Sequence, residues 1–269
     1  MSSISRIEGL IAQHYDQEAE FYDYLGTTHR SYSCNVWKPA TTTNDEAALN
    51  KYRQYNQILN VQPTDNVLEI GSGWGGMAKF FKNKVNSYRA INITKQQVDW
   101  TDANIPGVTF IHKAWQEYEP NRRFDFILGD GVLVHAKYAQ KRMFRRALRK
   151  WLKPNGKVLL KEMHFDPNSR VQKQICAGLN HTFKWGEYRT LQEDVDDLTD
   201  VGFTVNTTTI PIINYIKTMR EWKKQMRINR VRMKQIHTNK YRLDMATWNL
   251  YLELMRRGDF TVDIMVCNV

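Results

Sequence analysis

The chain has 269 residues, is 42% hydrophobic and carries a formal net charge of +11. A chain of this length and apolar content can bury one α/β core, so we expect a single domain over residues 1–269. No apolar run reaches the roughly 18 residues that cross a bilayer, the first residues lack a signal-peptide pattern, and three widely spaced cysteines argue against a disulfide framework or a zinc site. These features predict a cytoplasmic protein.

Helical and strand-like segments alternate through the middle of the chain. They are the helix 45–60, the strand VLEI at 67–70, the helix 75–84, the strand 87–93, the helix 95–104, the strands 107–111 and 124–129, a basic helix around 144–152, a turn at 153–156 and the strand 157–163. Strands that alternate with helices predict parallel pairing with right-handed crossovers, and therefore a doubly wound α/β sheet.

The C-terminal third adds two strands and a helical region. Segments 203–210 and 259–266 predict late strands that could form a hairpin at the sheet edge, and the residues between them, 213–257, predict long helices rich in Met, Trp and Ile. We expect these helices to cover the carboxyl edge of the sheet. Their apolar residues fit the wall of a greasy substrate pocket and core packing equally well.

Two segments supply the positive charge. Residues 137–161 contain no Asp or Glu, and between 217 and 242 the one acid is Glu221. The first segment is either a solvated crossover helix or a surface for an anionic partner, which would be a lipid surface or nucleic acid. The acidic run at 193–197 predicts an exposed helix start and has no ligand spacing for a metal.

A glycine-rich loop, GSGWGG, follows the first predicted strand at 71–76. Its G-x-G-x-x-G spacing serves both dinucleotides and S-adenosylmethionine. A dinucleotide fold needs an acid at the end of the second strand, but that strand ends in Asn92, and the next acid is Asp99. Glu69, just before the glycines, instead suits the ammonium group of S-adenosylmethionine. We therefore predict S-adenosylmethionine as the cofactor.

Several longer stretches give a more specific resemblance. HYDQEAEFYDYLGTTHRSYSCNVW at 14–37, VLEIGSGWGG, INITKQQ, FDFILGDGVLVHAKY and the C-terminal ATWNLYLELMRRGDFTVDIMV resemble the cyclopropane fatty acid synthase and mycolic acid methyltransferase family. The resemblance implies a class I methyltransferase (Rossmann-like) sheet with an antiparallel edge strand and a helical cap. Its segments would be an N-terminal helical cap (1–60), a cofactor-binding core (61–165), substrate-covering helices with the edge strand (166–257) and a last strand (258–269).

The same resemblance implies a set of cofactor contacts. Two residues of the YSC motif would close over the cofactor, three glycines would approach its methionine part, two polar residues would hold the ribose in place of the missing acid, and a Trp would lie beside the adenine. These residues are Tyr32 and Ser33; Gly71, Gly73 and Gly75; Asn92 and Gln97; and Trp115.

The resemblance breaks down at the residues that would remove a proton. In the family an alkene attacks the sulfonium methyl, the carbocation is stabilised by aromatic faces, and bicarbonate then takes the proton. That ion is held by a Cys, a Glu, a His and a Tyr. Cys34 and Tyr215 match, but Val134 and Lys161 occupy the Glu and His positions. We therefore expect a reaction that does not depend on bicarbonate.

Two other residues could handle the proton. His135 follows Val134, and its unperturbed pKa of about 6.5 suits a base near neutral pH, although it could equally be a helix-start residue. Asp130 ends the fourth strand and either faces the substrate or serves as a turn acid. Glu162 should point to the opposite face of its strand from Lys161.

These features predict a methyltransferase acting on an unsaturated or lipid-like substrate, and a small specialised metabolite methylated on nitrogen or carbon is the alternative. Nucleic-acid modification is disfavoured because Gly-Asp-Gly-Val at 129–132 is not the Asn/Asp-Pro-Pro-aromatic motif of amino-group methylases. A non-catalytic role as a cofactor-binding module is a further alternative, because the base site is altered. The basic helices suggest peripheral contact with an anionic membrane surface, and the oligomeric state is left undetermined.

Overall fold

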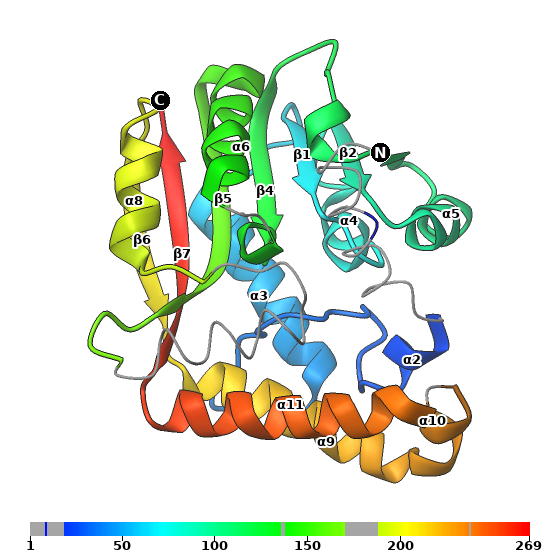
Figure 1. The fold of residues 1–269 in the computed structure, drawn as a ribbon. Coiled ribbons are helices and arrows are strands. Elements are labelled where there is room, and N and C mark those ends of the chain that lie inside the picture. Colours follow the sequence, from blue (N-terminus) through cyan, green and yellow to red (C-terminus); the bar gives the residue numbers. More distant parts are fainter. Residues whose placement is uncertain (1–8, 10–18, 136–137, 170–187, 237) are drawn as a thin grey trace.

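The computed structural model describes residues 9, 19–135, 138–169, 188–236 and 238–269. Seven strands form one sheet in the order β3-β2-β1-β4-β5-β7-β6 (Figure 1). The strands are β1 (Asn66–Ile70), β2 (Ser87–Asn92), β3 (Thr109–His112), β4 (Phe124–Asp130), β5 (Leu152–Phe165), β6 (Thr204–Ile210) and β7 (Phe260–Asn268). The first five run parallel, whereas β7 runs antiparallel between β5 and β6. The predicted doubly wound sheet is confirmed, and its antiparallel strand, β7, lies next to the edge strand β6.

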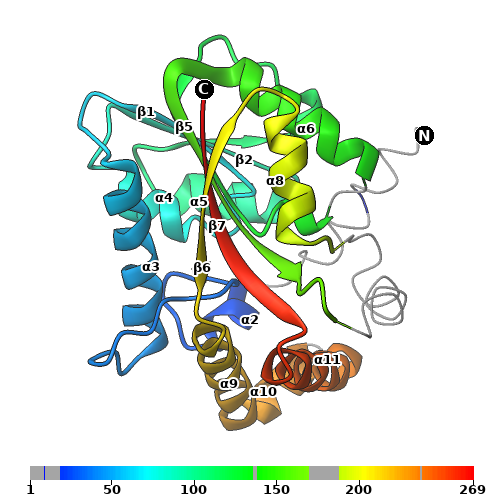
Figure 2. The same cartoon turned by 90° about the vertical axis from the view of Figure 1, so that its left-hand side faces the viewer.

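Helices cover both faces of this sheet. Figure 2 shows α3 on one side and α6 and α8 on the other. The helices of the two faces are α3 (Asn44–Leu59), α4 (Gly76–Phe81), α5 (Lys95–Asn104), α6 (Tyr138–Trp151) and α8 (Leu191–Thr199), and short 3-10 turns lie at Trp115–Glu117 (η1) and Leu133–His135 (η2). Local sequence fixes the start of α3, where Thr43 and Glu46 form a capping box.

The alternation of side chains along the strands builds two core layers. Leu159 packs in the cluster with Tyr52 and Tyr55 of α3, whereas its neighbours Val158 and Leu160 pack in the cluster with Phe144 and Leu148 of α6. Continuing this period of two places Lys161 toward α3 and Glu162 toward α6 and α8. The expected opposite orientation of Lys161 and Glu162 follows directly.

A third layer closes the lower end of the molecule. Helices α9 (Ile213–Ile228), α10 (Arg230–Ile236) and α11 (Thr238–Arg256) lie across the carboxyl ends of the parallel strands, near the short α2 (Ala19–Asp23) (Figure 1). Their inward side chains form a cluster rich in Trp and Met, including Met219, Trp222 and Trp248. Of the helices that the structure describes, none is long and apolar enough to cross a bilayer.

One local prediction is wrong, and another is confirmed. Residues 153–156 were predicted as a turn but belong to β5, whose pairing with β4 begins at Leu152, opposite Phe124. The pairing resumes with Lys157 opposite Phe126, so a register irregularity between Phe124 and Phe126 accommodates these four residues. Gly156 makes this possible, because a Cβ there would lie 2.8 Å from the Asp125 carbonyl oxygen. The two late strands pair antiparallel at the edge of the sheet, as expected, with β6 outermost and three helices between them in the chain.

Candidate active site

A cavity of about 300 Å³ opens at the carboxyl ends of the parallel strands, beneath the layer of α9, α10 and α11, which is called the cap from here on. This is where ligands bind in open α/β sheets. Twelve of the thirteen predicted site residues line it, namely Tyr32, Ser33, Cys34, Glu69, Gly71, Gly73, Asn92, Gln97, Trp115, Asp130, His135 and Tyr215. Gly75 is the exception.

The glycine loop connects β1 to α4. Its glycines share one backbone conformation but differ in what surrounds them. Gly71, Gly73 and Gly75 have φ angles of 74°, 52° and 74°, in the left-handed region that favours glycine. A Cβ on Gly73 would meet no atom within 4 Å, so this position leaves room for a ligand. A Cβ on Gly75 would lie 2.5 Å from Ile105, so Gly75 serves packing of the loop on α5.

Gly76 is a glycine that the sequence analysis missed. A Cβ there would lie 2.4 Å from the backbone oxygen of His29. His29 belongs to residues 26–37, a segment here called the strap, which passes from the glycine loop to α9. The strap is fastened to α9 by backbone amides of Asn35 and Trp37, which donate to Thr218 (3.2 Å) and Asn214 (2.6 Å). Close contact between strap and glycine loop therefore requires glycine at position 76.

Buried polar atoms without a partner in the described chain surround the glycine loop. They include the Ser72 hydroxyl, the Trp74 indole Nε1 and Nη1 of Arg30 on one side, and Oε1 of Gln116 on the other. All four residues line the cavity. Because unsatisfied buried polar groups are costly, such atoms point to a polar ligand. Donors beside a glycine loop fit an amino-acid carboxylate, and an acceptor beside Trp115 fits an adenine amino group, so the residues present fit S-adenosylmethionine.

The predicted ribose pair lies together at the end of β2. Asn92 donates to Gln97 Oε1 over 2.7 Å and to the Gly73 carbonyl over 3.4 Å. Trp115, in η1, is half-buried and packs edge-on against Phe144 at 5.1 Å. The structure thus places these three residues on the wall of the cavity predicted to hold the nucleoside.

Glu69 lies on the α3 face of β1, opposite Leu128 in register. It is buried, and the hydroxyl of Tyr88 donates to it over 2.8 Å. Burial raises the pKa of Glu69 to about 8, although this hydrogen bond works against the shift. Without a ligand the carboxyl is therefore largely protonated at neutral pH, and a nearby ammonium group would favour its ionisation.

A cluster of buried charges forms part of the cavity wall; it consists of Lys51, Asp130 and Lys161 and is here called the Asp130 cluster. Asp130 and Lys161 are register partners on adjacent strands, and their side chains are 2.7 Å apart. Lys51 reaches Asp130 from α3 over 3.1 Å, and Ser33 donates to the same carboxylate over 2.9 Å. Burial alone would raise the pKa of Asp130, but the ammonium groups of Lys161 and Lys51 lower it to about 2.

Lys51 was missed by the sequence analysis, although the sequence carries a signal for it. It stands in the apolar stripe of α3, three and four residues from Ala48, Ala47 and Tyr55, which are all buried. A lysine on such a face is almost never buried without a partner. The stripe alone could not show that the partner is Asp130, 79 positions further on.

The other proposed proton-transfer residues have unexpected titration behaviour. Burial and the charge of Lys141 lower the pKa of His135 to about 4, so the assumed ordinary value near 6.5 does not hold. Burial raises the pKa of the Cys34 thiol to about 11, which keeps it protonated at neutral pH. Cys34 donates weakly to the Asn35 carbonyl over 3.5 Å. Both side chains line the cavity as neutral groups.

Aromatic rings form the end of the cavity beneath the cap. Tyr32 stacks on Trp222 at 4.9 Å, and Trp222 lies 5.6 Å from Trp248. Tyr215 meets Trp222 edge-on at 6.2 Å. All four line the cavity. Their ring faces carry negative charge density and can stabilise a cation.

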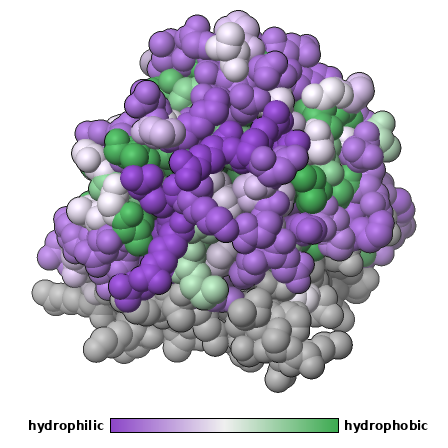
Figure 3. Space-filling model, turned by 90° about the horizontal axis from the view of Figure 1, so that it is seen from above, coloured by the Kyte–Doolittle hydropathy of each residue, from purple (hydrophilic) through white to green (hydrophobic). Residues whose placement is uncertain are grey.

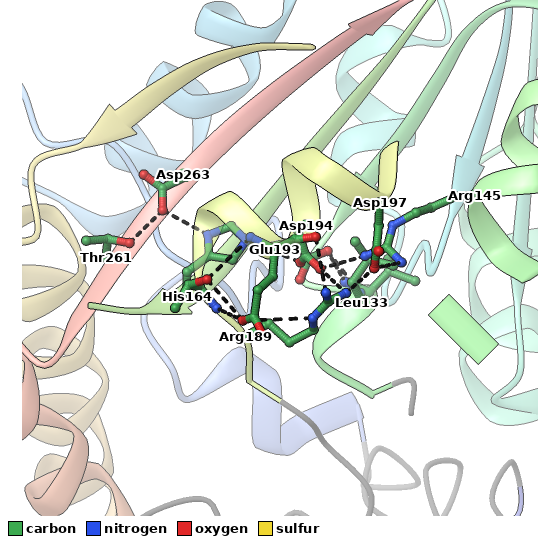
Figure 4. Close-up of polar contacts among 12 residues, drawn as sticks. Leu133, Arg145, His164, Arg189, Glu193, Asp194, Asp197, Thr261 and Asp263 are labelled. Atoms are coloured by element: carbon green, nitrogen blue, oxygen red, sulfur yellow. Dashed lines mark hydrogen bonds and ion pairs between the residues drawn. The ribbon is translucent and has the colours of Figure 1, made fainter. Parts of the chain in front are cut away.

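A second polar network lies behind the cavity, between β5, β7, α6 and α8 (Figure 4). His164 contacts Asp263 over 2.8 Å and Asp194 over 3.4 Å, and Arg145 pairs with Asp194 over 2.6 Å and with Asp197 over 2.8 Å. Burial would lower the pKa of His164, but the two carboxylates raise it to about 9. Asp194 and Arg145 are buried, so the prediction of an exposed acidic helix start and a fully solvated basic helix is wrong at these positions.

This network continues into the loop that carries His135. Glu162 Oε1 accepts hydrogen bonds from the backbone amides of Val132 and Leu133, both 2.9 Å long. The loop between β4 and α6 is therefore held from the far side of the sheet. Val134 and His135 line the cavity from the same loop.

A known protein family matches nearly the whole chain. The profile of the mycolic acid cyclopropane synthetase family matches residues 3–268. A probable fatty acid methyltransferase of Pseudomonas putida is 22% identical over 228 residues, which are 80% of this chain and 57% of the relative, so the chain spans little more than half of that protein. The (S)-coclaurine N-methyltransferase of Papaver somniferum is 22% identical over 255 residues, 88% of this chain and 70% of the relative.

The fold has solved counterparts. The crystal structure of mycolic acid cyclopropane synthase CmaA1 complexed with SAH and CTAB superposes with a TM-score of 0.88 at 19% identity, covering 97% of this chain and 98% of the other. At that identity the likeness establishes the class I methyltransferase architecture. Because the family profile covers nearly the whole sequence, the chain belongs to the mycolic acid cyclopropane synthetase family.

Proposed function

We propose that the chain transfers a methyl group from S-adenosylmethionine to an unsaturated, lipid-like carbon nucleophile. The observation that carries this proposal is one continuous cavity that joins the donors of the glycine loop to the aromatic rings beneath the cap. The bound cofactor would supply an electrophilic methyl group on a sulfonium. The chain's own part is to align the substrate with that methyl and to exclude water.

Each end of the cavity has its own task. Ser72, Trp74 and Arg30 would hold the amino-acid end of the cofactor, and Gln116 its adenine, because these are the buried polar atoms that lack partners. The strap closes the cavity on one side through its contacts with Gly76 and α9. Tyr32 and Trp222 would face the positive charge that appears on the substrate as the methyl group arrives.

Asp130 is the fixed anion of the site. With a pKa of about 2 it stays ionised at neutral pH, held by Lys51 and Lys161. So weak a base cannot deprotonate an ammonium efficiently, but a carbocation loses a neighbouring proton to far weaker bases than a carboxylate. In the family, bicarbonate removes this proton, and here Val134 and Lys161 occupy two of the positions that hold the ion. The Asp130 carboxylate would accept the proton in place of bicarbonate.

Methylation of a small metabolite on nitrogen or carbon is the second candidate. The same aromatic rings suit an ammonium ion, and about 300 Å³ is at the lower end of the volumes of small-molecule sites. Similarity to the (S)-coclaurine N-methyltransferase of Papaver somniferum across 88% of the chain supports this candidate. For an amine, His135, neutral at pH 7, would be the better proton acceptor.

Calorimetric titration tests the cofactor. S-adenosylmethionine and its demethylated product should bind, and NAD should not; binding of NAD alone would refute the proposal. Because the pKa of Glu69 is raised to about 8, affinity should increase as the pH rises through that value, and Glu69→Gln should remove this dependence. Transfer of labelled methyl to unsaturated phospholipids, compared with small secondary amines, then separates the two substrate classes.

A further inference from the structure

The outer face of α9 carries a stripe of exposed residues, here called the basic stripe. It consists of Ile213, Lys217, Arg220, Lys224, Arg227 and Ile228. They recur at intervals of three, four or one residues, which places them within about 100° of arc on a helix. Four of the six are basic, and an exposed isoleucine stands at each end. The stripe therefore has a basic middle and an exposed apolar residue at each end.

Little within the described chain neutralises this charge. Lys217, Arg220 and Arg227 form no ion pair with an acid there, and Lys224 is 3.5 Å from Glu221. Burial lowers the pKa of the neighbouring Lys223, and the charges of Arg227, Arg256 and Arg220 lower it further, as expected for a strongly positive surface. In α6, Arg145 and Lys150 are matched to acidic partners, whereas Arg142 and Arg146 are exposed and form no ion pair within the described chain.

Apolar side chains are exposed where the stripe ends. Ile228 is 66% exposed, and Val231, three residues on in α10, is 74% exposed. Ile213 at the other end is 48% exposed. At the opposite end of the molecule, seen from above in Figure 3, the surface is largely hydrophilic and its hydrophobic residues lie in small, separate patches. An uncovered apolar corner beside unpaired arginines marks a contact surface.

The inner face of the same helix lines the cavity. Met219 and Trp222, on the side of α9 away from the stripe, form part of its wall. We propose that the basic stripe, with Val231, rests on an anionic lipid bilayer, so that α9 separates the membrane surface from the substrate end of the cavity. Lysines and arginines would pair with lipid phosphates while Ile213, Ile228 and Val231 enter the headgroup region.

The apolar residues decide between the possible anionic partners. Nucleic acid would satisfy the basic residues through its phosphates but would leave Ile228 and Val231 in water. A bilayer buries both kinds of group at once, and charge attraction combined with buried apolar area is what holds interfacial helices. Within α9 itself the one acid is Glu221, which is half-buried and accepts a hydrogen bond from Gln225, so the stripe presents no exposed carboxylate of its own helix to lipid phosphates.

Vesicle co-sedimentation of the full chain tests the proposal without any cofactor or substrate. The protein should bind vesicles of equal parts phosphatidylcholine and phosphatidylglycerol and not vesicles of phosphatidylcholine alone. Each basic residue near such a surface is worth about 1 kcal/mol, or roughly fivefold in binding. Arg220→Glu with Arg227→Glu should therefore weaken binding by at least about 25-fold. Ile228→Ser with Val231→Ser should weaken it at high salt, where the charge contribution is screened.

The matched control is on α6. Arg142→Glu with Arg146→Glu changes the net charge equally at two exposed positions and should leave vesicle binding near that of the wild type. The proposal is overturned if the α6 variant loses binding as much as the α9 variant, if neither does, or if a DNA duplex binds through Arg220 and Arg227 while vesicles do not. Unchanged binding of the demethylated cofactor would show that the α9 variant is folded. A failure of cofactor binding in every form would overturn the methyltransferase proposal and leave the membrane result standing.

Discussion

Asp130→Asn should destabilise the fold because it leaves two buried ammonium groups without their shared anion. Lys51 and Lys161 are 1% and 3% exposed at their side chains, and both lie within 3.1 Å of the carboxylate. The pKa of Asp130 falls from 3.8 to about 2, which corresponds to about 2 kcal/mol of stability at neutral pH. Removing one partner of a buried pair costs about 3 to 5 kcal/mol, so we expect a loss of about 3 kcal/mol.

The pH dependence has a definite sign. A depressed carboxylate pKa contributes stability that is present above about pH 4 and is lost as the pH falls toward 2. Urea unfolding of wild type and variant should therefore differ most near neutral pH, and the difference should narrow in acid. Adding Lys161→Met to Asp130→Asn should restore part of the loss, because one uncompensated charge is removed.

Two outcomes would refute this reasoning. An Asp130→Asn variant within about 0.5 kcal/mol of the wild type at neutral pH would mean that the lysines are not held as charges by Asp130. A double variant less stable than Asp130→Asn by the full cost of losing Lys161 would show that the two residues act independently.

The remaining predictions concern the ligand site. Gly73→Val should abolish binding of the demethylated cofactor in calorimetry while the protein stays folded, whereas Gly76→Ala should lower the melting temperature because its Cβ would clash with the strap. Turnover should be equal in degassed and bicarbonate-supplemented buffer, since Val134 and Lys161 replace two of the ion's ligands; a severalfold rise would contradict this. His135→Ala should lower turnover on an amine by less than the roughly hundredfold that a base with a pKa near neutral supplies, because a base with a pKa of about 4 accepts a proton weakly, and the ascending limb that it removes from the pH profile should lie near 4 rather than 6.5.

The sequence by itself determined the sheet and the position of the cavity. Periodicity marks each strand because one strand alternates between two faces, and the glycines at 71 and 73 indicate a backbone that adopts positive φ, at Gly73 next to open space. The long helices after 213 were recognisable from their apolar stripes. Those signals are local, since they depend on residues a few positions apart, and local patterns survive in any tertiary context.

Only the tertiary structure decided which charges are buried and paired. Asp194 and Arg145 stand in segments that look solvated, yet they are buried because α8 packs against α6, where the two side chains pair, and β5 brings His164 to the other oxygen of Asp194. Lys51 meets Asp130 for the same reason, since α3 crosses the sheet at the end of β4. Burial and pKa depend on what packs against a residue from distant parts of the chain, and no spacing within one segment contains that information.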